Sequence, residues 1–313
     1  MLAHHKPSDT LHVIAVVSNP ARFESRYRLY REFPQRIAGN ERIQLHTVEI
    51  AHGARPHAVT GPNDVQLRTD QELWQKEAMI NVALKRLPAD WRYVAWVDAD
   101  VQFVRPDWAE ETIHRLQHHS IVQMFEHAID LGPSGQVIQQ HTSLGSLVQA
   151  GKPVSAAATS EYYAGARFGH PGFAWAATRE ALDSTGGLLD QGILGASDHH
   201  MALGLIGEAE KSSPAGLHPN YYKMVRQWQD RATVHIRRNF GAVSGVLLHH
   251  WHGRKADRQY GSRWDILKRH NFDPEVDIYK DTQGLWRLHG NKPGLRDDVR
   301  RYFASRNEDS VDI

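Results

Sequence analysis

The stretch YVAWVDADVQF, residues 93–103, joins an apolar run to two aspartates one residue apart. Five apolar residues in a row, Tyr93–Val97, are typical of a central strand buried on both faces. Residues i and i+2 of a strand face the same side, so we expect Asp98 and Asp100 to converge where the strand ends. Because two such carboxylates repel each other unless a cation or a basic side chain neutralises them, the pattern favours a divalent-cation site over a capped turn, which stays open as the alternative.

The segments around this stretch alternate between strands and amphipathic helices. Apolar patterns predict further strands over 11–18, 42–51 and 120–131, and helices over 22–33, 70–88 and 106–119. Such alternation predicts a mostly parallel α/β sheet with right-handed crossovers. Ligands of these sheets bind beyond the carboxyl ends of the strands, which here are the polar segments SNPAR (residues 18–22) and DAD (98–100).

Composition excludes several classes of protein. The net charge of +1 provides no overall cationic field for nucleic acid, and no apolar stretch approaches the roughly 20 residues that span a bilayer. The absence of cysteine excludes a disulfide framework, thiolate zinc sites and a cysteine nucleophile. The N-terminal MLAHHKPSDT lacks the apolar region of a secretory signal, so we expect a cytoplasmic location, which is the host cytoplasm if a phage encodes the chain.

Six segments together carry a resemblance to a known family. They are VVSNPARF, LWQKEAMINVAL, WRYVAWVDADVQF, PGFAWAATREAL, GGLLDQGILGASDHHM and LHHWHGRKADRQY, which lie in this order within residues 12–275. The chain resembles GT-A (Rossmann-like) glycosyltransferases of the family 2 type, and its C-terminal half is similar to that of galactosyltransferases and polypeptide N-acetylgalactosaminyltransferases. The resemblance implies one catalytic domain with an irregular acceptor half, a UDP-sugar donor, and Mn²⁺ (or Mg²⁺) as the cofactor. It also implies that Asp100 binds the metal while Asp98 lies nearer the ribose or the sugar hydroxyls.

A histidine cluster, LLHHWHGRK (residues 247–255), supplies candidates for a further metal ligand. In similar enzymes a histidine from the C-terminal half completes the metal shell, and a mixed oxygen and imidazole set suits manganese better than magnesium. His250 and His252 share a face of an extended segment, so we predict His250 as the ligand, followed by His252. A structural role for these histidines stays open as the alternative.

The segment GASDHHM predicts a helix capped by Ser197, with Asp198 in its first turn. Acids are common at this position because they interact favourably with the helix dipole. Similar inverting enzymes use an acid before such a helix to remove the acceptor proton, which implies Asp198 as the catalytic base. Asp190 is the alternative acid. We assign Trp175 of PGFAWAA and His199 to the sugar and acceptor site, and Phe173 to the core.

Polar residues near the two strand ends complete the predicted donor site. The predicted roles are contacts with the base and ribose and pairing with the diphosphate. The residues assigned to this donor site are Ser18, Asn19, Pro20, Arg22, Glu49, Lys76, Asp98, Arg254 and Lys255. Solvated surface charges are the alternative interpretation for Glu49 and Lys76. The C-terminal tail, residues 306–313, is predicted to fray.

The sequence therefore predicts a metal-dependent glycosyltransferase that moves a hexose from a UDP-sugar to a hydroxyl group, with inversion. We divide it into a nucleotide-sugar-binding half (1–135), an acceptor half (136–275) and a C-terminal extension (276–313). A saccharide is the expected acceptor, and a hydroxymethylated base in DNA, as for phage glycosyltransferases, is the alternative. A metallohydrolase and a non-catalytic sugar-binding protein stay open. The oligomeric state is not predicted.

Overall fold

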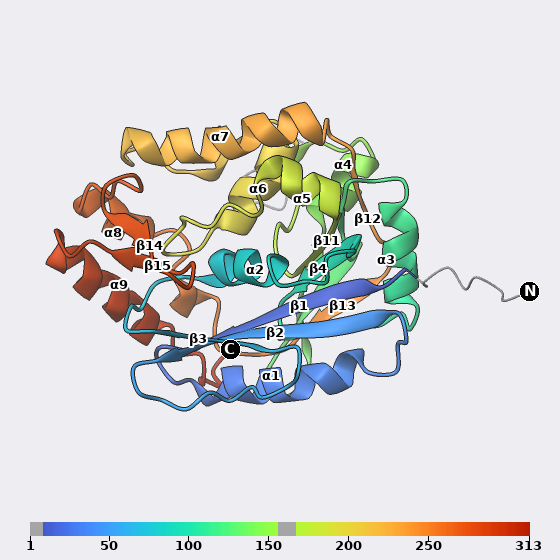
Figure 1. The fold of residues 1–313 in the computed structure, drawn as a ribbon, viewed down its shortest axis with the longest axis horizontal. Helices are drawn as coiled ribbons and strands as arrows, with labels where there is room; N and C mark the ends of the chain where they lie inside the picture. Colours follow the sequence, from blue (N-terminus) through green and yellow to red (C-terminus); the bar gives the residue numbers. More distant parts are fainter. Residues whose placement is uncertain (1–8, 156–166) are drawn as a thin grey trace, which may run out of the picture.

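A seven-stranded sheet forms the centre of the computed structural model, which describes residues 9–155 and 167–313 (Figure 1). Across the sheet the strands are β12 (Phe240–Ala242), β6 (Ile121–Gln123), β11 (Ala174–Thr178), β4 (Tyr93–Val97), β1 (Leu11–Ser18), β2 (Ile43–His52) and β3 (Val65–Thr69). Only β11 among these seven runs against its neighbours. The expected α/β fold with a mostly parallel sheet is confirmed. Since β11 and β12 follow residue 135 and β1–β4 precede it, the two predicted halves share this sheet.

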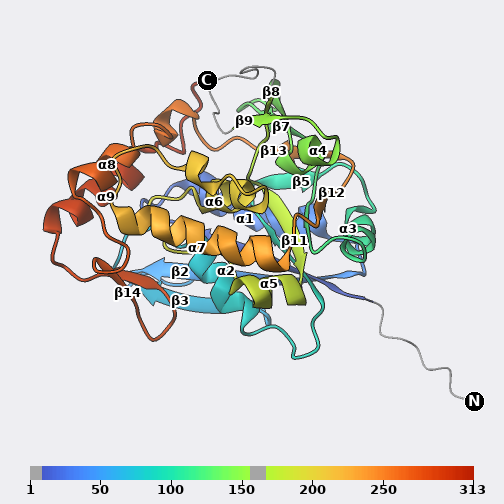
Figure 2. The same ribbon diagram turned by 90° about the horizontal axis from the view of Figure 1, so that it is seen from above.

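Helices cover both faces of the sheet because side chains of the buried strands alternate between two cores. Leu11, Val13 and Ala15 of β1 pack with α1 (Glu24–Ile37) and α3 (Trp108–Leu116), whereas Ile14 packs in the core on the opposite face. That opposite core contains α2 (Lys76–Leu84), α5 (Arg179–Thr185), α6 (Ser197–Leu205) and α7 (Pro219–His235). Figure 2 shows α7 lying across this side of the molecule. Among the described residues, no helix is both long and apolar enough to cross a membrane.

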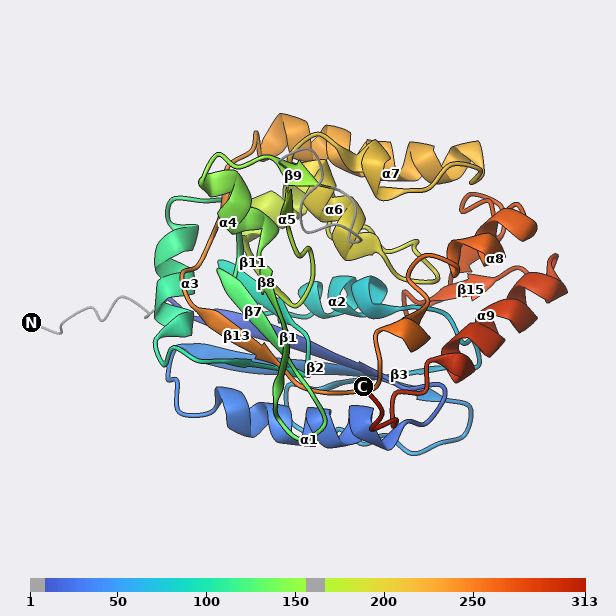
Figure 3. The ribbon, with the colours of Figure 1, turned by 180° about the vertical axis from the view of Figure 1, so that it is seen from behind.

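A four-stranded sheet brings the histidine cluster beside the aspartates. Its order is β5 (Val101–Phe103), β13 (Val246–His249), β7 (His127–Leu131) and β8 (Val137–Thr142). Figure 3 shows β13 beside β7, to which it runs parallel. Antiparallel pairing of β13 with β5 places His249 opposite Val101, so the end of β13 meets the residues that follow β4.

The remaining elements connect and close the fold. They are α4 (Leu144–Gln149), β9 (Val154–Ser155), β10 (Arg167–Phe168), α8 (Trp264–Arg269), β14 (Ile278–Lys280), β15 (Trp286–Leu288) and α9 (Pro293–Ser305), with short 3₁₀ helices at Ala209–Ser212 and Ala256–Arg258. Asp190 anchors the β14–β15 hairpin, because its carboxylate accepts hydrogen bonds from Trp286 Nε1 (3.1 Å) and Lys280 Nζ (2.5 Å). Its carboxylate is thus engaged by the hairpin, and the role of Asp190 as the alternative acid stays a prediction.

Three local predictions differ from the structure. The helix expected over 70–88 begins only at Lys76, because the Gln75 side chain is held by the backbone of Trp286 in β15. The strand expected over 120–131 is divided between β6 and β7, which belong to different sheets. The tail is packed as far as Asp309, whereas its last three residues are exposed: Glu308 is 1% exposed, and the Asp309 carboxylate accepts hydrogen bonds from backbone amides at the start of α1.

Two histidines are buried against each other between β1 and β2. His12 Nδ1 and His46 Nε2 lie 3.0 Å apart, and both side chains are less than a tenth exposed. Burial, together with the charge of His12, lowers the pKa of His46 to about 4. Burial also lowers the pKa of His12. In the unfolded chain both return to about 6.5, so the unfolded state binds more protons between about pH 6.5 and pH 4.

The fold should therefore lose stability as the pH falls through this window. We expect the free energy of unfolding to fall between pH 7.5 and pH 5 by about 2 kcal/mol more in the wild type than in His46→Gln, which has no titrating ring at this position. Urea unfolding at each pH measures the difference, with exposed His118 changed to Gln as the matched control. The same pH dependence in the wild type and in His46→Gln would contradict the assignment.

Candidate active site

A cavity of about 760 Å³ opens where β1 and β4 end. Ser18 and Asp98, at the ends of these two strands, line one side, Asp198 at the start of α6 lines another, and Glu308 of the C-terminal tail also reaches it. The cavity thus lies where the topology of a parallel sheet places a ligand. Of the predicted site residues, those that line it are Ser18, Asn19, Pro20, Lys76, Asp98, Asp100, Asp198, His199, His252 and Lys255.

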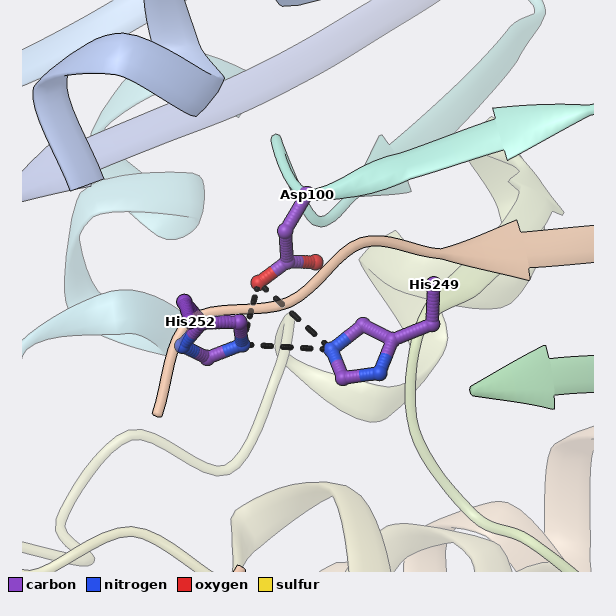
Figure 4. A group of neighbouring side chains, drawn as sticks. All are labelled: Asp100, His249 and His252. Carbon is purple, nitrogen blue, oxygen red and sulfur yellow. Dashed lines mark hydrogen bonds and ion pairs between the residues drawn. The ribbon is translucent and has the colours of Figure 1, made fainter. Parts of the chain in front are cut away.

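Three side chains in this cavity form a group with the spacing of metal ligands, Asp100, His249 and His252 (Figure 4). Asp100 Oδ2 lies 3.0 Å from His252 Nε2 and 3.9 Å from His249 Nε2, and the two Nε2 atoms are 3.1 Å apart. Asp100 comes from the turn after β4, whereas both histidines come from the end of β13 and the loop that follows it. The three ligand atoms converge on one point from two separate parts of the chain.

The chemistry of this group fits a divalent cation. Burial opposes ionisation of Asp100, but His252 and His249 hold the pKa of its carboxyl well below the usual range, so that it is a carboxylate at neutral pH. Its Oδ1 is buried and has no hydrogen-bond partner in the part of the chain that the structure describes. Burial lowers the pKa of His249, which leaves this imidazole neutral with a lone pair to donate. One carboxylate and two imidazoles are a ligand set that suits manganese.

His250 does not belong to this group, which corrects the expected pairing of His250 with His252. The prediction required an extended segment, but β13 ends at His249 and the chain turns, so that His252 returns to the side of His249. His250 Nε2 is buried without a hydrogen-bond partner among the described residues. Burial and the charge of Arg36 lower the pKa of His250 to about 4.

Asp98 and Asp100 face different partners. The strand ends at Val97, and a turn that joins Val101 N to Asp98 O (3.3 Å) replaces the extended geometry expected for these residues. Asp98 forms an ion pair with Lys76 at the start of α2. Burial raises the pKa of Asp98 above its usual value and the Lys76 ammonium opposes this shift. Both carboxylates nevertheless line the cavity, and Lys76 lines it beside Asp98.

Asp198 lies in the first turn of α6, as predicted, although the helix begins differently from the expectation. Ala196 is the N-cap and has a left-handed backbone (φ 77°), while Ser197 is already helical and its hydroxyl is buried without a partner in the described ranges. Asp198 Oδ1 accepts a hydrogen bond from His199 N (2.8 Å). A Cβ atom at Gly172 would lie 2.9 Å from Asp198 Oδ2, so this glycine leaves the space that the carboxylate occupies.

The loop after β1 contributes to the cavity through its shape. The Asn19 side chain spans the loop, because Nδ2 donates to Phe23 O (2.7 Å) and Oδ1 accepts from Phe23 N (3.0 Å). Ser18 Oγ lies 3.3 Å from His52 Nε2. These bonds hold Ser18, Asn19 and Pro20 in place where they line the cavity.

Besides His250, four predicted residues do not line the cavity. Glu49 is 2% exposed and accepts hydrogen bonds from Ala58 N and Val59 N, so its carboxylate holds a loop rather than a nucleotide. Arg254 pairs with Asp257, which is three residues along the chain. Arg22 is exposed to solvent outside the cavity, and Trp175 does not line the cavity either.

Trp175 belongs to the core and not to a sugar platform. It lies on β11, which is central in the sheet, is 5% exposed, and donates from Nε1 to Pro171 O (2.8 Å). Phe173, expected in the core, is buried but also lines the cavity, where its ring stacks on His170 with 4.0 Å between centroids. Phe173 and Trp175 are two residues apart and would share a face of a regular strand, but the left-handed backbone of Phe173 (φ 76°), just before β11, ends that alternation.

The sequence analysis missed a cluster of charges on the cavity wall, formed by the half-buried Arg26 and by the buried side chains of Arg258, Arg306 and Glu308. Arg26 Nη2 and Arg306 Nε each lie 2.7 Å from Glu308 Oε1. Arg258 Nη2 lies 3.0 Å from His252 Nε2, so the cluster adjoins the metal-binding group. These arginines come from α1, the loop after β13 and the C-terminal tail. No local motif joins such distant positions, and the assumption of a frayed tail hid two of them.

Comparison with solved structures finds proteins of the kind that the sequence resembles. The catalytic domain of Drosophila β1,4-galactosyltransferase 7, solved with xylobiose, is 10% identical and aligns over 91% of this chain and 97% of its own, with a TM-score of 0.39. A variant of the same enzyme was solved with manganese, UDP-Gal and xylobiose and is 9% identical over 91% of this chain and 96% of its own, also with a TM-score of 0.39. A structure from Desulfovibrio desulfuricans described as a nucleotide-diphospho-sugar transferase is 12% identical over 76% of this chain and 81% of its own, with a TM-score of 0.33.

No protein-family model matches the chain, and no curated protein matches it in sequence. The chemistry of the site is therefore argued below from the side chains in the cavity.

Proposed function

We propose that this chain is a metal-dependent glycosyltransferase that moves a hexose from a UDP-sugar to a hydroxyl acceptor with inversion. One observation carries the proposal: the Asp100, His249 and His252 group and the Asp198 carboxylate line the same cavity at the carboxyl ends of β1 and β4. A cation site and a separate carboxylate are the two parts that such a transfer needs, one for the leaving group and one for the acceptor.

The donor side of the cavity is basic. A divalent cation held by Asp100, His249 and His252 would supply positive charge to the donor diphosphate as it leaves. Arg26 and Arg258, which line the cavity beside this group, would donate hydrogen bonds to the remaining phosphate oxygens. Lys76 is paired with Asp98 and lies within reach of the same space. These residues replace Arg254 in the predicted set.

On the acceptor side, Asp198 would remove the proton of the attacking hydroxyl. The acceptor oxygen then forms a bond to the anomeric carbon while the bond from that carbon to the diphosphate oxygen breaks, and the electron pair leaves with the nucleoside diphosphate. Attack from the face opposite the leaving group inverts the anomeric centre. The exposed side of Asp198 opens to the cavity, and its Oδ1 is oriented by His199 N, so the carboxylate is held in one direction.

A saccharide fits the acceptor side better than a modified base in DNA. Phe168, His170 and Tyr260 line the cavity and offer ring faces for sugar C–H surfaces. Trp251, an aromatic side chain that could stack on a DNA base, donates from Nε1 to Ser310 O (2.6 Å), which commits this indole to the C-terminal tail.

Ligand-dependent thermal unfolding tests the function. UDP, GDP and a panel of UDP-sugars are each added with and without manganese. We expect a uridine nucleotide to raise Tm by a few degrees only when manganese is present, because the nucleotide and the cation share one site. Incubation of the stabilising UDP-sugar with saccharide acceptors, or with hydroxymethylated DNA, then identifies the class of acceptor by product analysis.

Two other outcomes of these experiments would favour the two alternative functions, a metallohydrolase and a non-catalytic sugar-binding protein. Zinc-dependent phosphoester cleavage without sugar transfer would indicate a metallohydrolase. Stabilisation by free sugars without nucleotide or metal, together with no turnover, would indicate a sugar-binding protein. Either result would overturn the proposed transfer.

A further inference from the structure

Each imidazole of the metal-binding group has two ring nitrogens with different surroundings. Both Nε2 atoms face Asp100, while each Nδ1 faces a buried carboxylate on its other side. His249 Nδ1 lies 2.7 Å from Asp130 Oδ1, which is a hydrogen bond, whereas His252 Nδ1 lies 3.9 Å from Glu308 Oε2. A carboxylate accepts but does not donate, so Asp130 fixes the ring proton of His249 on Nδ1.

Asp130 is held firmly for this contact. It lies on β7 directly beside His249 of β13 in the parallel register, and its side chain is 4% exposed. Its second oxygen accepts from His141 Nε2 (2.6 Å) on β8 and from Lys255 Nζ. The carboxylate of Asp130 is thus held by three partners, His141, Lys255 and His249, and its Oδ1 points toward the His249 ring.

We propose that Asp130 is the positioning residue of the metal site, and this inference rests on the proposed function. With the proton fixed on Nδ1, the Nε2 lone pair of His249 points toward Asp100 and His252, where the cation would bind. The charge of Asp130 also makes the ring a stronger donor to the cation. Lys255, which the sequence analysis placed in the donor site, then acts by holding Asp130 rather than by contacting phosphate. His141, which had no predicted role, holds Asp130 in the same way.

The change Asp130→Asn tests this role. An amide that donates to Nδ1 moves the ring proton to Nε2 and removes the lone pair that binds the cation. We expect the Kd for manganese to rise by about 10- to 100-fold, measured as free Mn²⁺ by EPR in a titration of the whole chain with manganese alone. Pulsed EPR of the bound ion should show coupling to two imidazole nitrogens in the wild type and a weakened or missing coupling from one of them in the variant. A residue that acts only in folding would not change one nitrogen signal selectively.

Glu126→Gln is the matched control, because it neutralises a half-exposed carboxylate at the edge of the same strand, whose nearest charged partner is His127. We expect it to keep the wild-type Kd and spectrum. If Asp130→Asn does not fold, Asp130→Glu provides the same test: it retains the charge that faces His141 and Lys255 but displaces the carboxylate from Nδ1, so the Kd for manganese should again rise.

The outcomes separate the two proposals. Wild-type affinity and an unchanged two-nitrogen spectrum in a folded Asp130 variant would overturn the positioning role and leave the metal site in place. A wild type that binds manganese without any imidazole coupling would instead contradict the metal site itself, and with it the proposed function.

Discussion

Replacing Asp100 by Asn is expected to abolish metal-dependent transfer. The amide keeps the size of the side chain but removes the charge that the cation and the two histidines face. We expect the manganese Kd to rise by at least about 100-fold and kcat/KM for the UDP-sugar to fall by about 10³-fold or more at fixed manganese. EPR titration measures the affinity, and product formation measures the transfer.

Two adjacent histidines provide a matched comparison for this prediction. His249→Gln removes a ligand of the proposed site, whereas His250→Gln changes a ring that lies outside it. We expect the first variant to lose manganese affinity and the second to keep it. The reverse result would restore the ligand choice made from the sequence, and full metal-dependent activity in Asp100→Asn would contradict the site altogether.

Replacing Asp198 by Asn should produce the second-largest loss, with a different kinetic signature. Asn cannot accept the proton of the acceptor hydroxyl, so kcat should fall by about 10²- to 10⁴-fold. Binding of manganese and UDP should stay at the wild-type level, because Asp198 is not part of the metal-binding group formed by Asp100, His249 and His252. Steady-state kinetics together with nucleotide titration separates the two effects.

Gly172→Ala and Asp190→Asn complete this test. The added methyl group at Gly172 would meet Asp198 Oδ2 at 2.9 Å and displace the carboxylate without removing it, so kcat should also fall.

Asp190→Asn changes the other candidate acid, which anchors the β14–β15 hairpin, and should lower Tm while the folded protein keeps its kcat. A wild-type kcat in Asp198→Asn would rule out its role as the base.

The fold follows from local patterns, which explains why most of it could be predicted from the sequence. The apolar run of β4 and the alternating strands and helices before it predict a parallel sheet with a polar edge, and the structure has both. The same reasoning selects Asp100, Asp198 and the loop 18–20, since each follows the end of a strand or begins a helix, and in the structure all of them line one cavity.

The errors arise where the chain departs from regular geometry. His250 was chosen over His249 because an extended segment was assumed beyond the end of β13, and Trp175 was chosen over Phe173 because the left-handed backbone at Phe173 carries no sequence signal. The contact of Arg26 with Glu308 joins residues more than 100 positions apart in the sequence. The same is true of the contact of Asp130 with His249. Such contacts depend on tertiary packing, and no spacing rule within one sequence reports them.

The position of the cation is the most direct test of the account. Crystals grown with manganese and UDP, and measured at the manganese absorption edge, should give one anomalous peak bound by Asp100, His249 Nε2 and His252 Nε2, with the diphosphate beside it. An anomalous peak elsewhere, or a diphosphate bound with none of these three side chains near its metal, would contradict it.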